Sequence, residues 1–233
     1  TLAAFAIVAT MSQRDLTRID AQWPAYRALV AERGARDFRA AITSSLDGLR
    51  GVAARALDAP AAPGDAFDAL ASLTAGAPEQ GVVLYDRGIP AAWAGKLAAS
   101  PDSARGAVGA LHTPFYTVLY ATAARGDRRA VATAVAYAEP PGDQLAPGIG
   151  NRIAQEQGLH AFDVLPSAEG AMVGSFVYVA NGDTLLVAHA VAPGQEEARL
   201  NTLVHVRLSG ALLLALAFAL FLVAAWRLQR SFP

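Results

Sequence analysis

The chain of 233 residues contains no cysteine. This absence excludes disulfides, thiolate metal sites and cysteine nucleophiles, although it does not decide the compartment, because secreted and cytosolic proteins can both lack cysteine. Charged residues are also scarce, at 17%, the formal net charge is -1, and there is no basic block. Since nucleic-acid phosphates are bound by concentrated Lys and Arg, we expect no nucleic-acid partner.

Motifs of catalysis are missing as well. The four histidines, His112, His160, His189 and His205, show neither HxxxH nor HExxH spacing, so the sequence predicts no metal site. There is no GxxxxGK phosphate loop and no GxSxG elbow, and GIGNRI, from Gly148, lacks the third glycine of a dinucleotide fingerprint. We therefore expect a non-enzymatic protein with no cofactor.

Long apolar runs, in contrast, are present near both ends. The 19 residues between Arg207 and Arg227, LSGALLLALAFALFLVAAW, carry no charge and as a helix would cover roughly 28 Å. This run predicts a transmembrane helix. Arg207, Trp226, Arg227 and Arg230 are its expected membrane anchors, because Trp favours the headgroup depth and Arg the polar layer.

The first residues form a shorter apolar run, TLAAFAIVATM. As a helix it would cover less than a bilayer core, so we interpret it as the end of a first transmembrane helix, with a signal-peptide remnant as the alternative. Basic residues near both runs do not decide the side of the membrane on which the domain lies.

The interior begins as a helix and continues as strands. Phe38, Ile42, Leu46 and Leu49 recur every three or four residues, which predicts a long amphipathic helix that ends near APAAPG. We expect five parts. Residues 1–13 are the end of a first membrane helix, residues 14–60 form a helical stalk, and residues 61–200 form a sensor-like domain. Residues 201–227 form the second membrane helix, and residues 228–233 form a polar tail.

Alternating segments after Pro78 predict three hairpins. They are GVVLY with IPAAWAG, TPFYTVLYATAA with RAVATAVAYA, and AMVGSFVYVA with TLLVAHAVA. A short helix, NRIAQEQG, and a strand, LHAFDVLP, lie between the second and third. We expect an α+β fold with one antiparallel sheet of about six or seven strands and flanking helices, tethered by N- and C-terminal transmembrane helices.

Taken together, the helix leading into the domain, the hairpin GVVLYDRGIPAAWAG, the hairpin around ARGDRRA and the return helix EEARLNTLVHVRLSG resemble a known module. They look like the PAS or Cache-like extracytoplasmic sensor module of bacterial transmembrane histidine kinases. The resemblance implies a small-molecule pocket in the sheet and a periplasmic domain held at the bacterial cytoplasmic membrane. The kinase part is absent from the sequence, so the chain is either a fragment of a longer kinase or a complete accessory subunit.

Two functions therefore stay open. The first is a sensor-like binding module that acts through its membrane helices and partner chains. The second is an accessory structural subunit of a larger integral membrane complex, such as a photosynthetic or respiratory one. The expected partners are the lipid bilayer, other membrane protein chains and a small-molecule ligand.

The candidate ligand-binding residues are mainly aromatic. Tyr116 and Tyr120 are four residues apart, so on a strand they share one face. Trp93 lies on the first hairpin, and His112 and Arg152 are the expected polar contacts. The alternative is that these aromatic rings fill the core between sheet and helices.

Overall fold

The computed structural model describes residues 10, 13–14, 16–139 and 147–231, and it describes no side chains from 220 onward. The chain divides into two compact units. Residues 31–191 form one of them, and residues up to 30 together with those from 192 form the other. Each unit is described by itself.

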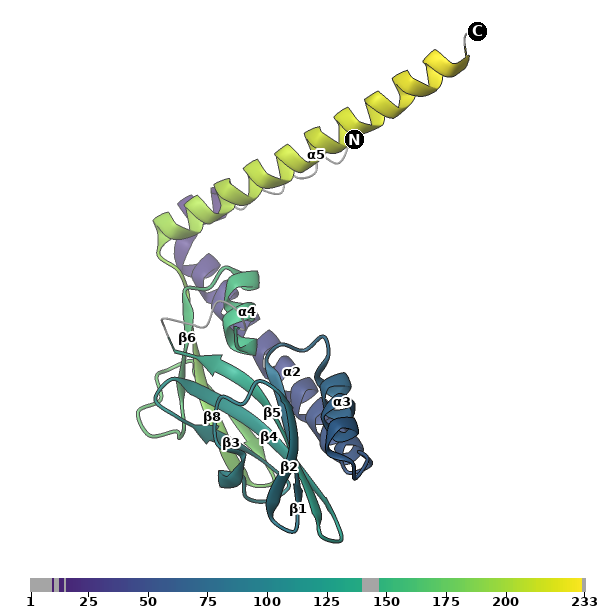
Figure 1. Cartoon of the computed structure of the whole chain (residues 1–233). Helices are drawn as coiled ribbons and strands as arrows, with labels where there is room; N and C mark the ends of the chain where they lie inside the picture. Colours follow the sequence, from purple (N-terminus) through teal and green to yellow (C-terminus); the bar gives the residue numbers. More distant parts are fainter. Residues whose placement is uncertain (1–9, 11–12, 15, 140–146, 232–233) are drawn as a thin grey trace. The chain divides into compact units, whose positions relative to one another are not determined.

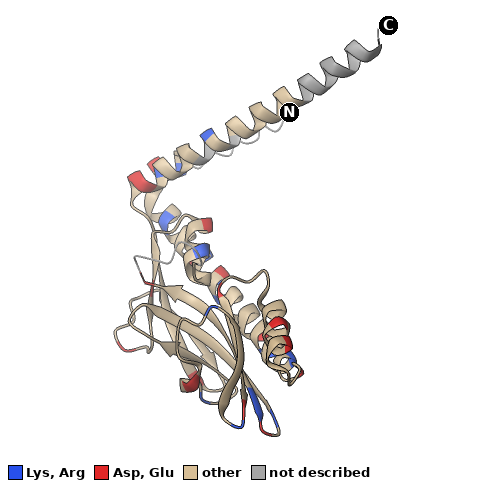
Figure 2. Cartoon of the chain, viewed as in Figure 1, with Lys and Arg blue, Asp and Glu red and all other residues tan. Residues whose placement is uncertain are grey.

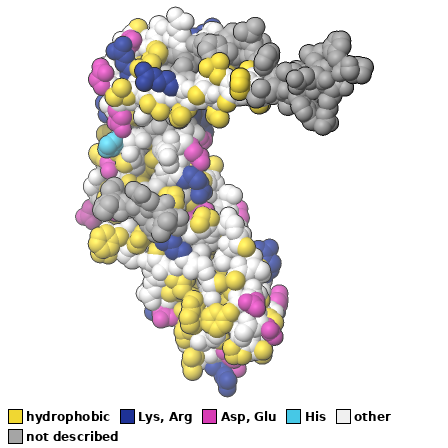
Figure 3. All heavy atoms as spheres, turned by 45° about the horizontal axis from the view of Figure 1, so that its top comes forward, with side chains coloured by type: hydrophobic (Ala, Val, Ile, Leu, Met, Phe, Trp, Pro, Cys, Tyr) yellow, Lys and Arg dark blue, Asp and Glu magenta, His cyan; other side chains and the backbone are white. Residues whose placement is uncertain are grey.

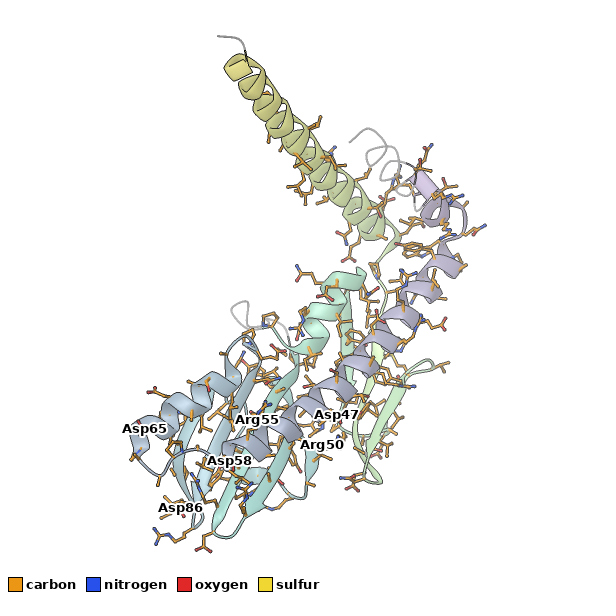
Figure 4. The ribbon with its side chains drawn as sticks, turned by 90° about the vertical axis from the view of Figure 1, so that its right-hand side faces the viewer. Asp47, Arg50, Arg55, Asp58, Asp65 and Asp86 are labelled. Carbon is orange, nitrogen blue, oxygen red and sulfur yellow. The ribbon has the colours of Figure 1, made fainter. Side chains whose placement is uncertain are left out.

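Three helices contribute to the 31–191 unit: α2 (Trp23–Ala56), α3 (Pro63–Thr74) and α4 (Ile149–Gln157). The predicted amphipathic pattern of α2 is confirmed, since one stripe along it is buried. Its members are Phe38, Ile42, Leu46, Leu49, Ala53 and Ala56. The opposite side carries charges, among them Asp47 and Arg50, which form an ion pair one turn apart (Figure 4).

A five-stranded antiparallel sheet forms the larger layer, in the order β2-β1-β5-β4-β3. Its strands are β1 (Gln80–Asp86), β2 (Ile89–Gly95), β3 (Val108–His112), β4 (Tyr116–Arg125) and β5 (Arg128–Ala138). In the β1–β2 turn both central residues, Arg87 and Gly88, have positive φ, as a two-residue type I′ turn requires. The first two predicted hairpins are therefore confirmed.

Both faces of this sheet are buried. Ala130 and Ala132 alternate with Val131 along β5, so they lie on the face opposite to Val131. On the Val131 face, Tyr85 and Tyr120 pack with Ala104, which follows the short helix η1 (Pro101–Ser103). Helices α2 and α3 lie along the alanine-rich face (Figure 1), where the small side chains allow close packing.

A separate three-stranded sheet has the order β6-β8-β7. It comprises β6 (Ala161–Leu165), β7 (Phe176–Ala180) and β8 (Asp183–Val191). This sheet packs against α2 through Phe38. The ring centroid of Phe38 lies 4.6 Å from that of Phe162 and 6.0 Å from that of Phe176. Figure 2 shows both sheets mostly without charge along their strands and with charges at their hairpin ends.

The prediction of a single sheet of six or seven strands is wrong, although the α+β class and the antiparallel pairing are confirmed. Within the described residues, eight strands form two sheets, because β6 pairs with β8 and no ladder joins β8 to β3. The sequence prediction missed β3, whose segment GAVGALH contains two glycines and two alanines and so has little strand character.

In the other unit, residues 16–21 are helical and α5 runs from Gln195 to Ser231. The Gln195 side-chain amide donates a hydrogen bond of 2.9 Å to the Ile19 carbonyl, and Ile19 and Ala198 are buried. Much of α5 remains exposed, and Figure 3 shows hydrophobic side chains along its described part.

The two predicted transmembrane helices require correction. Within the residues that the structure describes, no helix is both long enough and apolar enough to cross a membrane. The first apolar run, together with its signal-peptide alternative, lies mostly outside the described residues.

Candidate functional site

The candidate site is a cleft of about 560 Å³ where the start of β4 meets β6. Its walls come from both sheets of the 31–191 unit, since β4 belongs to the five-stranded sheet and β6 to the three-stranded one. The lining residues are His112, Thr113, Pro114, Phe115, Tyr116, Thr117, Glu139, Val164 and Pro166.

The turn between β3 and β4 shapes one wall of the cleft. Thr113 holds it closed, because its backbone N–H donates to the Tyr116 carbonyl (2.9 Å) and its hydroxyl accepts from the Tyr116 N–H (2.9 Å). Pro114 suits this turn because its φ is already restricted. Phe115, at the tip, is therefore held outward with 64% of its surface exposed.

His112 sits at the end of β3 with both ring nitrogens engaged. Nε2 lies 2.9 Å from the Leu185 carbonyl of β8, and since a carbonyl only accepts, Nε2 carries the proton. Nδ1 lies 3.3 Å from the Thr117 hydroxyl. The imidazole thus ties the edge of the five-stranded sheet to β8 and offers the cleft no free nitrogen.

Glu139 follows β5 directly and lies across from the turn. Its backbone N–H donates to the Phe115 carbonyl (2.9 Å). The preceding residue is fixed by Asn151, whose side chain accepts from the Ala138 N–H (2.9 Å) and donates to the Ala138 carbonyl (2.8 Å). The end of β5 is therefore held firmly, while the Glu139 side chain is exposed.

Charge around the cleft affects a neighbouring tyrosine. Burial and, to a lesser extent, the negative charge of Glu139 raise the pKa of Tyr137 to about 12. A second charge lies close to Tyr116. The Lys96 ammonium is 5.5 Å from the centroid of the Tyr116 ring and lies over one face of that ring. Lys96 is not part of the cleft lining, so Glu139 is the one carboxylate or ammonium among the lining residues.

The structure brings together only two of the five predicted ligand-binding residues, His112 and Tyr116. Tyr120 is 5% exposed, and its hydroxyl bonds to the backbone of Arg105 in the core. The β4–β5 register shifts between Thr117 and Val118, which separates the surroundings of the two tyrosines.

The remaining two have structural partners elsewhere. Trp93, on the edge strand β2, packs its ring edge-to-face on Phe67 of α3 at 4.9 Å. Arg152 of α4 lies 3.5 Å from Glu79 Oε1. Neither contributes to the cleft lining.

The predicted anchors lie on α5. Arg207 is exposed, and the side chains of Trp226, Arg227 and Arg230 are outside the described part of the structure. Their predicted role as membrane anchors depended on the predicted transmembrane helix, so the structure gives it no support.

Sequence reasoning missed Phe115 and Glu139, which the cleft presents most openly. Their signals were an aromatic residue inside a Thr-Pro turn, where a core role is unusual, and a carboxylate directly after an apolar strand. Val164 was missed because only tertiary structure brings β6 beside the β3–β4 turn.

Among the residues described, no three His, Asp or Glu side chains gather in a way that could hold a metal ion. The chain has no match among protein-family models, curated proteins or solved structures. The resemblance to PAS or Cache-like modules and the expectation of a non-enzymatic protein therefore stay predictions.

Proposed function

We propose that this protein is a non-catalytic binding module that takes a small molecule in the His112–Tyr116 cleft. The observation that carries the proposal is the cleft itself. Its volume of about 560 Å³ is in the range of small-molecule sites, and its lining combines apolar and aromatic residues with a similar share of polar ones.

The bonding of the polar groups supports binding rather than catalysis. A catalytic histidine takes a proton from a substrate or from a nucleophile that a substrate can reach. The hydroxyl nearest to the His112 ring belongs to Thr117, which is only 7% exposed. The Nε2 of His112 is hydrogen-bonded to the Leu185 carbonyl, and its Nδ1 is hydrogen-bonded to the Thr117 hydroxyl. The residue therefore holds the wall of the cleft in place.

A fragment titration followed by protein NMR tests this proposal. We expect several small aromatic fragments to shift the backbone amides of residues 113, 115–117 and 139. Phe115→Ala should weaken this binding about tenfold, because the ligand loses its contact with a largely exposed aromatic ring of the cleft lining. Ile89→Ala, which removes an apolar side chain that is 70% exposed on β2, is the matched control and should bind normally.

Either of two results would refute the module. One is a fragment library that leaves all cleft amides unshifted while the protein is folded. The other is equal loss of binding in the Phe115→Ala and Ile89→Ala variants.

A second candidate function, an accessory subunit within a larger protein assembly, is favoured by α5. Large apolar side chains are exposed over more than half of the circumference of its described part, given about 100° per residue. They are Leu200, Leu203, Val204, Leu208, Leu212, Leu214, Leu216 and Phe218. A surface this broad suits a partner chain that offers more than one apolar helix, since a single helix–helix seam is narrower.

The two candidate functions predict different co-purification behaviour for a double variant that carries both Leu208→Ser and Leu212→Ser. If the protein is an accessory subunit, this double variant should no longer co-purify with partner chains from its native source. Unchanged co-purification would count against the docking role of α5. Ligand binding in the cleft should survive the change in either case.

A further inference from the structure

We infer that the ligand of the cleft is an organic cation, an ammonium-type group attached to an aromatic or compact apolar body. The inference deepens the proposed function and rests on it. It follows from which groups of the cleft are already bonded and which are left for a ligand.

The imidazole of His112 and the hydroxyls of Thr113 and Thr117 in the lining are bonded within the protein itself. Both nitrogens of His112 are engaged, one with a carbonyl and one with Thr117. The hydroxyl of Thr113 bonds with both the N–H and the carbonyl of Tyr116. These groups position the wall, so a neutral polar ligand would have to break protein hydrogen bonds to use them.

Besides the Tyr116 hydroxyl, the polar side-chain group that remains is that of Glu139, the one carboxylate of the lining. Among the described residues its carboxylate has no hydrogen-bond or ion-pair partner, and its side chain is exposed at the cleft. A carboxylate only accepts hydrogen bonds, and its strongest partners are cationic donors. The sign of the charge therefore selects a ligand that carries an ammonium or amidinium group and disfavours an anion.

The aromatic residues fit the same ligand. Phe115 exposes most of its ring beside Glu139, to whose N–H its own carbonyl is bonded. A cation next to a carboxylate can also lie over an aromatic face, within about 6 Å of the centroid. The Lys96 ammonium already lies over one face of the Tyr116 ring, so this ring accommodates a cation. Pro114, Val164 and Pro166 supply apolar surface for the rest of the ligand.

Three probes of matched size separate the alternatives: benzylammonium, benzyl alcohol and benzoate. We expect benzylammonium to shift the amides of residues 113, 115–117 and 139 with an affinity about tenfold or more above that of the other two. Glu139→Gln should remove this preference and leave the affinity for benzyl alcohol unchanged. Glu156→Gln, an exposed change on α4 with the same loss of charge, is the control and should keep the preference.

Failure of this inference is distinguishable from failure of the binding module. Equal affinity for the three probes, a preference for benzoate, or a cation preference that survives Glu139→Gln would each overturn the cation class and leave the module standing. If other fragments bind the cleft but benzylammonium does not, the cation class is likewise overturned and the binding module stands. If no fragment of any charge reaches the cleft amides, the proposed function fails, and the inference fails with it.

Discussion

Replacing Phe38 with alanine is expected to lower the free energy of unfolding by about 3–5 kcal/mol, the usual cost of removing a buried phenylalanine. Phe38 is fully buried and contacts both Phe162 of β6 and Phe176 of β7. A sheet of three strands depends for its stability on a packed hydrophobic face or on a helix beside it. The cavity would therefore weaken the attachment of this sheet to α2 as well as the core.

Chemical denaturation measures the loss, and hydrogen exchange locates it. Amides of β6 and β8 should lose more protection than those of β1 and β5. Phe115→Ala, which removes the same ring from an exposed position, should change the free energy of unfolding by less than about 1 kcal/mol. Equal losses for the two variants would mean that the ring of Phe38 does not hold the smaller sheet.

Replacing Arg152 with alanine is expected to cost about 2 kcal/mol of folding free energy. The Glu79 side chain is only 11% exposed, its Oε2 is buried without a hydrogen-bond partner, and Oε1 faces the Arg152 guanidinium. Loss of the guanidinium leaves a buried negative charge alone, which costs about 3–5 kcal/mol in a fully buried pair. Arg152 is 43% exposed, so solvent screening reduces the figure.

The double variant Arg152→Ala with Glu79→Gln identifies the cause. If the lone charge is responsible, a neutral amide at position 79 should recover most of the loss, so that the changes are strongly non-additive. Arg50→Ala removes an exposed partner from the Asp47 pair and should cost less than about 0.5 kcal/mol. Additive losses in the double variant would contradict this account, and so would reduced cleft binding in the folded Arg152→Ala protein, since Arg152 is not in the cleft lining.

Local patterns in the sequence predicted the elements better than their assembly. The stripe from Phe38 to Leu49 and the turn residues Arg87 and Gly88 act over a few positions, so the helix and the hairpin could be recognised. The pairing of β6 with β8 crosses more than twenty residues, and no local signal separates it from membership of the larger sheet. The apolar run of α5 was interpreted as a span from its length, its lack of charge and its flanking residues, but the described residues contain no helix long and apolar enough to cross a membrane.

The site was predicted in part for the same reason. His112 and Tyr116 flank one turn and were found from chemistry and spacing. Tyr120 was assigned with Tyr116 by strand alternation, but the register shift at Thr117 and the hydrogen bonds to Arg105 place it in the core. Glu139 joins Phe115 only through contacts between separate elements, which periodicity does not encode.

The most direct test of the central claim, that the cleft holds a cationic ligand, is the measurement of intermolecular NOEs between bound benzylammonium and the protein. The account predicts NOEs from the methylene next to the ammonium to the Glu139 side chain, and from the probe's ring to the rings of Phe115 and Tyr116. NOEs confined to other surfaces, such as the Trp93 and Phe67 pair, would contradict it.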